Sequence, residues 1–179
     1  MSEEETEYED DIATLLLDKR QIEGQSIIKN HVIIAMVTGM VPIPILDAVY
    51  LVNTQFTMLQ RLSMLYEIPF TEIKKSLLIS LSSGALPVVG VVGMSSFLKV
   101  IPGIGSLAGS ASVSISGGAM TYAVGRVFLQ HFEQGGDFEN LDMDAAKSHL
   151  KQELEAGKQF ATSLISKVKA LAAEKKNKD

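Results

Sequence analysis

The stretch VPIPILDAV, residues Val41 to Val49, places two prolines inside a long apolar run. Between Asn30 and Gln60 the only charged residue is Asp47, which follows the prolines closely. The residue before a proline is pushed out of the helical region, so a helix is expected to end near Pro42. Pro44 suits the first turn of a new helix, where its missing N–H costs nothing. The stretch therefore predicts a turn between two helices.

Helical spacing extends on both sides of this turn. Upstream, residues 12–29 form a modestly amphipathic pattern that runs into an apolar segment ending near Val41. Downstream, a helix that starts at Pro44 is expected to continue to about Glu67. Its apolar residues recur at helical spacing, namely Leu51, Val52, Phe56, Leu59, Leu62 and Leu65. Together the two segments predict a helical hairpin.

A second apolar stretch is broken in a similar way. From Ser76 to Gly125 the chain has one charged residue, Lys99, and nine of its 14 glycines. Proline removes a backbone donor and glycine weakens a helix, so both interrupt such a run. Structural turns are expected at Pro87, Pro102, Gly103 and Gly105.

Small residues recur after the second break. They would destabilise a solvent-exposed helix, but in apolar surroundings they let two helix backbones approach closely. The candidate packing residues are Gly109, Gly117, Gly118 and Gly125. We predict that this Gly/Ser-rich helix packs closely against a neighbour and supports self-association.

The last part of the chain predicts one long helix. Residues 143–173 place apolar side chains on one side, namely Leu150, Leu154, Ala161, Leu164, Ile165, Val168 and Leu171. The fold class is therefore all-α, with helical hairpins broken by Pro/Gly turns and a long amphipathic C-terminal helix. The expected parts are an acidic disordered tail (1–11), a helical domain (12–136), a linker (137–142), and the C-terminal helix with a basic tail (143–179).

The charge distribution narrows the classes of partner. The formal net charge is −5, but residues 3–11 alone carry seven acids and no base, which leaves 14 acids and 16 bases elsewhere. No basic stripe is present to neutralise phosphates, so nucleic acid is not expected as a partner. The chain has no cysteine, and its three histidines are scattered, so no metal site is expected. The N-terminus lacks the pattern of a signal peptide.

Motifs for catalysis or cofactor binding are weak. The segment GIGSLAG, residues Gly103 to Gly109, imitates a dinucleotide-binding turn, but Pro102 precedes it and the nearest acid downstream is Glu133. The Gly-Lys pair in AGKQF lacks the other residues of a phosphate-binding loop. No Ser-His-Asp set stands out. We therefore expect no catalytic residues, no cofactor and no enzymatic activity.

The broken apolar runs raise the question of a membrane. Residues 32–41 and 77–86 are each ten residues long, which is about 15 Å of helix and half of a bilayer core. Two arrangements remain open: re-entrant hairpins buried by neighbouring protein, or kinked spans through residues 32–52 and 77–98. A soluble oligomer in which the apolar hairpins bury one another is the alternative to both.

Several of these residues together resemble a known family. The pattern comprises the Pro-x-Pro turn with its aspartate, a downstream glutamine, an Ile-Pro-Gly-x-Gly turn, and spaced small and aromatic residues. The matching positions are Pro42, Pro44, Asp47, Gln55, Ile101, Pro102, Gly103, Gly105, Gly109, Thr121, Gly125, Phe132 and Glu133. Over about three-fifths of its length, the chain resembles the bacterial domain of unknown function 697 (DUF697) family.

The resemblance implies a helical, membrane-associated module that is often joined to, or encoded near, small Ras-like GTPases. This chain has no GTPase domain, so such a partner would act in trans. The resemblance implies no catalytic residues. We therefore expect a non-enzymatic, self-associating protein at the cytoplasmic face of, or integral to, the inner membrane, which scaffolds or remodels the membrane or serves a small GTPase.

Overall fold

A computed structural model describes residues 3–38, 44–70 and 106–176. They form four helices: α1 (Glu3–Thr38), α2 (Pro44–Leu65), α5 (Ser106–Glu133) and α6 (Met143–Lys176). These ranges contain no strand, and the all-α fold class is confirmed. The expected turns at Pro42, Pro87, Pro102, Gly103 and Gly105 lie outside the described residues.

The start of α1 differs from the expected disordered tail. The helix begins at Glu3 and includes residues 3–11. Negative charges near a helix N-terminus interact favourably with the helix dipole, and no proline or glycine precedes Gly24 in this helix. The acidic segment is therefore the first part of a 36-residue helix.

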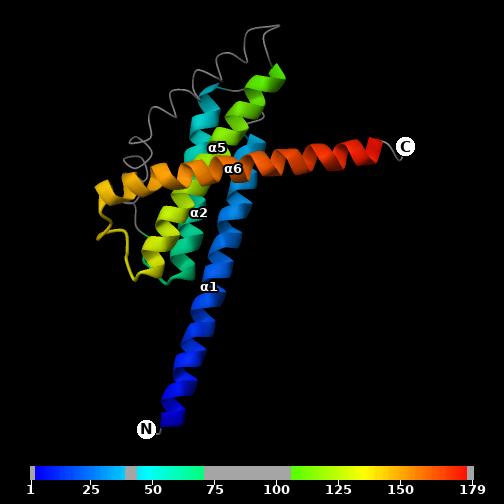
Figure 1. Cartoon of the computed structure of the whole chain (residues 1–179). Helices are drawn as coiled ribbons and strands as arrows, with labels where there is room; N and C mark the ends of the chain where they lie inside the picture. The colour runs from blue at the N-terminus through cyan, green and yellow to red at the C-terminus, as the bar shows by residue number, and fades with distance from the viewer. Residues whose placement is uncertain (1–2, 39–43, 71–105, 177–179) are drawn as a thin grey trace.

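The helices surround α5, which contacts each of the other three (Figure 1). α1 and α2 run antiparallel, and α5 runs alongside them in the direction of α2. α6 crosses the group, so that its C-terminal half and the N-terminal half of α1 extend beyond the packed body (Figure 1). Residues 32–52, considered above as one kinked span, fall partly in α1 and partly in the antiparallel α2. Within the described ranges, none of the helices combines the length and apolar character needed to cross a bilayer.

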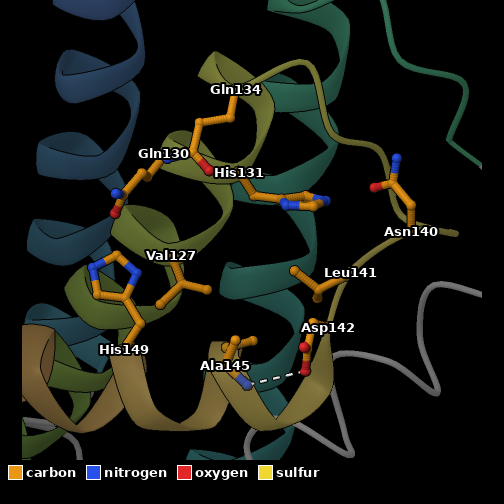
Figure 2. Close-up of a pocket in the computed structure, with 10 residues that line it drawn as sticks. Val127, Gln130, His131, Gln134, Asn140, Leu141, Asp142, Ala145 and His149 are labelled. Atoms are coloured by element: carbon orange, nitrogen blue, oxygen red, sulfur yellow. Dashed lines mark hydrogen bonds between the residues drawn. The ribbon is translucent and has the colours of Figure 1, made fainter.

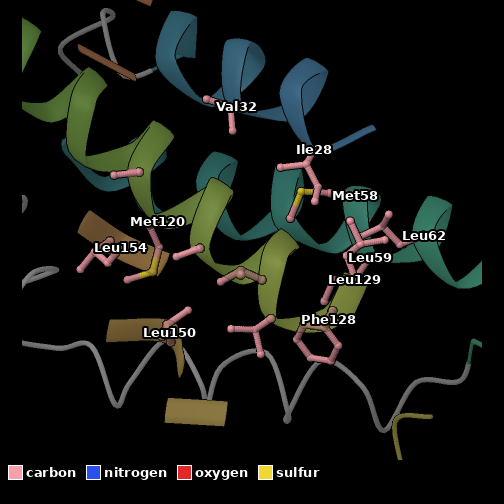
Figure 3. Packing of buried hydrophobic residues seen from close by; sticks show 14 of the residues in the cluster. Ile28, Val32, Met58, Leu59, Leu62, Met120, Phe128, Leu129, Leu150 and Leu154 are labelled. Carbon is pink, nitrogen blue, oxygen red and sulfur yellow. The ribbon is translucent and has the colours of Figure 1, made fainter. Parts of the chain in front are cut away.

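The core lies along α5 (Figure 3). Its largest fully buried side chains come from α1, α2, α5 and α6, and they include Ile28, Met58, Leu59, Leu62, Phe128, Leu129 and Leu150. Burying such side chains contributes about 1.5–3 kcal/mol each. This apolar contact positions the helices relative to one another.

The α5–α6 connection, residues 134–142, is pinned by one buried aromatic ring. Phe138 is 3% exposed, and its ring centroid lies 5.2 Å from that of Phe132 and 5.5 Å from that of Phe70. Gly135 has φ +79° and ends α5, where the Gly136 N–H donates to the His131 carbonyl at 2.9 Å. The connection is therefore a packed part of the body as well as a polar turn.

Candidate functional site

One end of the α1–α2 pair exposes an apolar surface. Its members are large apolar side chains that are between 40% and 59% exposed, near the C-terminus of α1 and in the first half of α2. They are Ile33, Ile34, Val37, Tyr50 and Val52. We call this set the apolar end.

Contacts between the helices fix the register of α1 against α2. Away from the apolar end, Arg20 Nη2 lies 2.6 Å from Glu67 Oε1. Closer to it, a methyl group added at Gly125 of α5 would lie 2.7 Å from Ile28 Cγ1 and 3.1 Å from Met58 Sδ. Ile28 and Met58 therefore lie at the same level along the axes of the two helices. Because α1 and α2 are antiparallel, the residue n positions after Ile28 is level with the residue n positions before Met58.

This register places the exposed apolar residues at one end of the helix pair. Six residues beyond Ile28 is Ile34, and six residues before Met58 is Val52. By the same count, Val37 of α1 is level with residue 49 of α2, one residue from Tyr50. The five side chains therefore occupy the same end of one helix pair, although they are separated by up to 19 positions in the sequence.

Few charged residues lie near the apolar end. Asp47 is the only charged residue from Asn30 to Gln60. Lys29 and Arg61 flank this range, and both are exposed. By the register above, Lys29 lies one turn from Ile33, whereas Arg61 is nine residues from Val52 along α2. Lys29 therefore lies at the border of the apolar end, and Arg61 lies further along the helix pair.

A buried polar layer lies one turn from the Ile28–Met58 level. It contains His31 of α1, Gln55 of α2 and Thr121 of α5, each at most 3% exposed. Gln55 Nε2 and Thr121 Oγ1 have no hydrogen-bond partner in the described part of the chain. Gln55 and Thr121 are two of the positions on which the family resemblance rests. Burial of unpaired polar atoms opposes folding, so their presence here is not explained by packing.

Burial of His31 favours its neutral form. Its Nδ1 donates to the carbonyl of Ile27 at 2.7 Å. Burial lowers the pKa of His31 below its ordinary 6.5; the hydrogen bond to Ile27 acts in the opposite direction, and the charge of Arg61 lowers the pKa further. A proton on His31 is therefore disfavoured in the folded protein.

The glycines expected to pack helices lie at contacts inside the chain. A methyl group at Gly118 would lie 2.6 Å from Met36 Cγ of α1. The corresponding methyl at Gly117 would lie at an ordinary 3.7 Å from the Ala35 carbonyl oxygen. Gly125 contacts α1 and α2, as given above. Gly109 belongs to α5, and its surroundings are not described.

Two further close contacts join α5 to its neighbours. A methyl group at Gly157 of α6 would lie 2.6 Å from the Ala119 carbonyl oxygen of α5. Ser114 Oγ donates to the Met36 carbonyl at 2.6 Å and joins α5 to α1. Gly157 is a single glycine in a charged, otherwise ordinary helix, so the sequence pattern gave no signal for its role.

Of the expected turn residues, two fall in the described part of the chain. Pro44 is the first residue of α2 and Asp47 lies in its first turn. Proline at a helix start and an acid near the helix N-terminus are both favourable. These positions account for the beginning of α2.

A hollow of about 290 Å³ lies at the opposite end of α5, beside the α5–α6 connection (Figure 2). Its polar groups already serve the fold. His131 Nε2 donates to the Asp137 carbonyl at 2.7 Å, and Asp142 Oδ1 accepts from the Ala145 N–H at 3.1 Å as a cap of α6. His149 Nε2 lies 3.3 Å from Glu153 Oε1. In the described ranges, no group of three or more His, Cys, Asp or Glu residues is placed to hold a metal ion.

Comparisons with known proteins place the chain in a family. The model of the family described as "Domain of unknown function (DUF697)" matches residues 4–159. The chain is 37% identical over 157 residues to magnetosome membrane protein 22 of Magnetospirillum gryphiswaldense, covering 87% of this chain and 80% of that relative. No solved structure matches the chain. The chain therefore belongs to the DUF697 family, as the sequence resemblance suggested.

Proposed function

We propose that this protein is a non-enzymatic, membrane-associated helical protein that attaches through its apolar end. The observation that carries this proposal is the gathering of five exposed apolar side chains at one level of the α1–α2 pair, without a charged residue in the described part of that level. Large exposed apolar side chains gathered at one end of a helix pair indicate an interaction site. Its occupant is the acyl boundary of a bilayer.

The charge at the border supports this occupant. Lys29 would lie at the headgroup level when the apolar end enters the membrane, and Arg61 would lie further from the bilayer. Each basic residue near an anionic surface contributes about 1 kcal/mol, and each Å² of apolar surface removed from water contributes about 25 cal/mol. The two contributions act together, as in interfacial helices.

The relative also supports a membrane setting, because its name is that of a magnetosome membrane protein. We place this chain at the cytoplasmic face of the inner membrane, or integral to it. Scaffolding or remodelling of the bilayer, or service to a small GTPase in trans, would be built on this attachment and on self-association.

Vesicle flotation tests the attachment. The full chain is mixed with vesicles of phosphatidylglycerol and phosphatidylethanolamine, and the floating fraction is measured. We expect the wild type to float, and Ile34→Asp with Val37→Asp to lower its vesicle affinity by at least about tenfold, since two apolar contacts are lost. Both side chains are exposed, so circular dichroism should be unchanged.

Met64→Asp is the matched control. Met64 is exposed on α2 but lies outside the apolar end, so this variant should float like the wild type. A wild type that stays with the soluble fraction as a defined oligomer would instead support the soluble helical module. Equal flotation of the double variant and the wild type would exclude the apolar end as the attachment site.

A further inference from the structure

Two helix segments extend beyond the packed body and point away from each other (Figure 1). We define the α1 arm as residues 3–23, of which Arg20 still contacts Glu67 at the edge of the body, and the α6 arm as residues 162–176. At 1.5 Å per residue, the arms are about 31 Å and about 22 Å long. Since the two ends diverge in Figure 1, neither arm can cover the other within one chain.

Both arms carry apolar side chains at a spacing that suits a helix partner. The α1 arm exposes Leu15, Leu16, Leu17 and Ile22, with exposed fractions from 55% to 70%. The α6 arm exposes Val168 at 63% and Leu171 at 67%, and Leu164 is half-buried at its base. Leu15 and Ile22 are seven residues apart, as are Leu164 and Leu171. This is the spacing of side chains on one face of a pair of helices.

The arms also carry opposite charges. Residues 3–11 of the α1 arm contain seven acids and no base. Residues 162–176 of the α6 arm contain four lysines and one glutamate. Opposite charge on two apolar arms favours contact between them and disfavours contact between two α1 arms or two α6 arms.

We propose that the α1 arm of one copy pairs antiparallel with the α6 arm of a second copy. With Leu15 opposite Leu171, Ile22 lies opposite Leu164 and Asp11 lies level with Lys175. The antiparallel direction also brings the N-terminus of one helix to the C-terminus of the other, where the helix dipoles attract. A parallel pair would place the acids beyond Leu164, away from the lysine-rich end.

The pairing closes as a dimer. Each copy has both arms, so a two-fold arrangement makes the contact twice and covers both apolar faces. Lys19 and Lys167 come level in this register as a like-charge pair, whereas Asp10 and Asp11 come level with Lys176 and Lys175. The contact uses neither the apolar end nor a membrane, so its failure and that of the proposed function are distinguishable.

Disulfide trapping between two variants tests the pairing, because the chain has no cysteine of its own. Full-length Leu15→Cys and Leu171→Cys are mixed and oxidised without lipid, and the products are separated on a non-reducing gel. A disulfide needs Cα atoms within about 7 Å. We expect a mixed dimer of twice the 19.4 kDa chain mass, with peptide mass spectrometry showing a 15–171 link.

Two cysteine pairs serve as controls. Leu15→Cys with Leu164→Cys shifts the partner by seven residues, or about 10 Å, and should cross-link at least about tenfold more slowly. Leu15→Cys with Met64→Cys gives the background rate of collision. The proposal is overturned if the 15–164 link dominates, or if the 15–171 link forms no faster than this background.

A charge swap tests the choice of partner. Lys175→Glu with Lys176→Glu in the Leu171→Cys chain should lower the cross-linking rate about threefold or more at low salt, since exposed ion pairs are individually weak. Adding Asp10→Lys and Asp11→Lys to the Leu15→Cys chain should restore the rate. An unaffected rate overturns the charge argument. Loss of vesicle binding by the lysine variant, with no cross-link in any pair, would assign the α6 arm to lipid instead.

Discussion

Two apolar regions of this molecule have similar residue types and opposite environments. Around α5, Ile28, Met58 and Phe128 are at most 1% exposed. At the apolar end, a few turns further along the same α1–α2 pair, Ile34 and Val37 are 49% and 59% exposed. The first region holds the helices together, whereas the second is the surface that we propose for membrane attachment. Substitutions should therefore act on stability in the first region and on attachment in the second.

Phe128→Ala should have the largest effect on stability. The ring is fully buried and packs against Phe132 and Phe138, with centroids at 5.8 Å and 5.5 Å. Its removal leaves a cavity, and we expect the free energy of unfolding to fall by about 3–5 kcal/mol. Urea unfolding followed by circular dichroism measures this. The exposed substitution Met64→Ala is the control. If Phe128→Ala lowered the free energy of unfolding no more than this control, the assignment of the core would be contradicted.

Gly157→Ala tests the close approach of α5 and α6. The added methyl would meet the backbone of Ala119 rather than a flexible side chain, so one helix must shift. We expect a loss of about 1–3 kcal/mol in unfolding free energy. Ala156→Ser, at the exposed position next to it, is the matched control and should change stability little. Equal stabilities of the two variants would mean that α6 lies further from α5.

Acid should weaken the core through His31. The pKa of His31 is lowered in the folded protein, so the unfolded chain takes up a proton at higher pH than the folded one. The contribution to stability is complete above about pH 6.5 and falls as the pH decreases towards the lowered pKa. Unfolding measured between pH 7.5 and 5 should show this loss, and His31→Gln should flatten it. A loss of equal size in His31→Gln would assign the effect to other groups.

Tyr66→Phe should have a small effect of the opposite sign. The Tyr66 hydroxyl is buried and has no hydrogen-bond partner among the described residues. Burial, with the charge of Glu133 adding to it and that of Arg20 opposing it, raises the pKa of Tyr66 to about 12. Removing the hydroxyl should leave the unfolding free energy unchanged or raise it by about 1 kcal/mol. A clear loss of stability would reveal a partner for this oxygen.

Sequence periodicity was sufficient for the all-α fold and for the starts of α2 and α6 at Pro44 and Met143. It did not distinguish core residues from exposed ones, because Leu154 and Leu171 follow the same spacing on α6. Leu154 is buried against the body, whereas Leu171 lies on the arm beyond it. Whether a residue at this spacing is buried depends on the lengths and directions of the neighbouring helices, which are tertiary properties.

The apolar end could be predicted in part. The charge-free run around Pro42 and Pro44 indicated an unusual apolar segment, but which side chains it exposes depends on the antiparallel register of α1 and α2. Phe138 was not predicted as a core residue because it lies in a mostly polar connection. Gly157 was missed because its role depends on a carbonyl oxygen of another helix, at Ala119.

The most direct test of the account labels the apolar end itself. Because the chain has no cysteine, Val37→Cys can be labelled with an environment-sensitive dye, and Met64→Cys serves as the matched position outside the apolar end. On addition of anionic vesicles, we predict a blue-shifted and stronger emission from position 37 and little change from position 64. Equal responses at the two positions, or no response at position 37, would contradict membrane attachment through the apolar end.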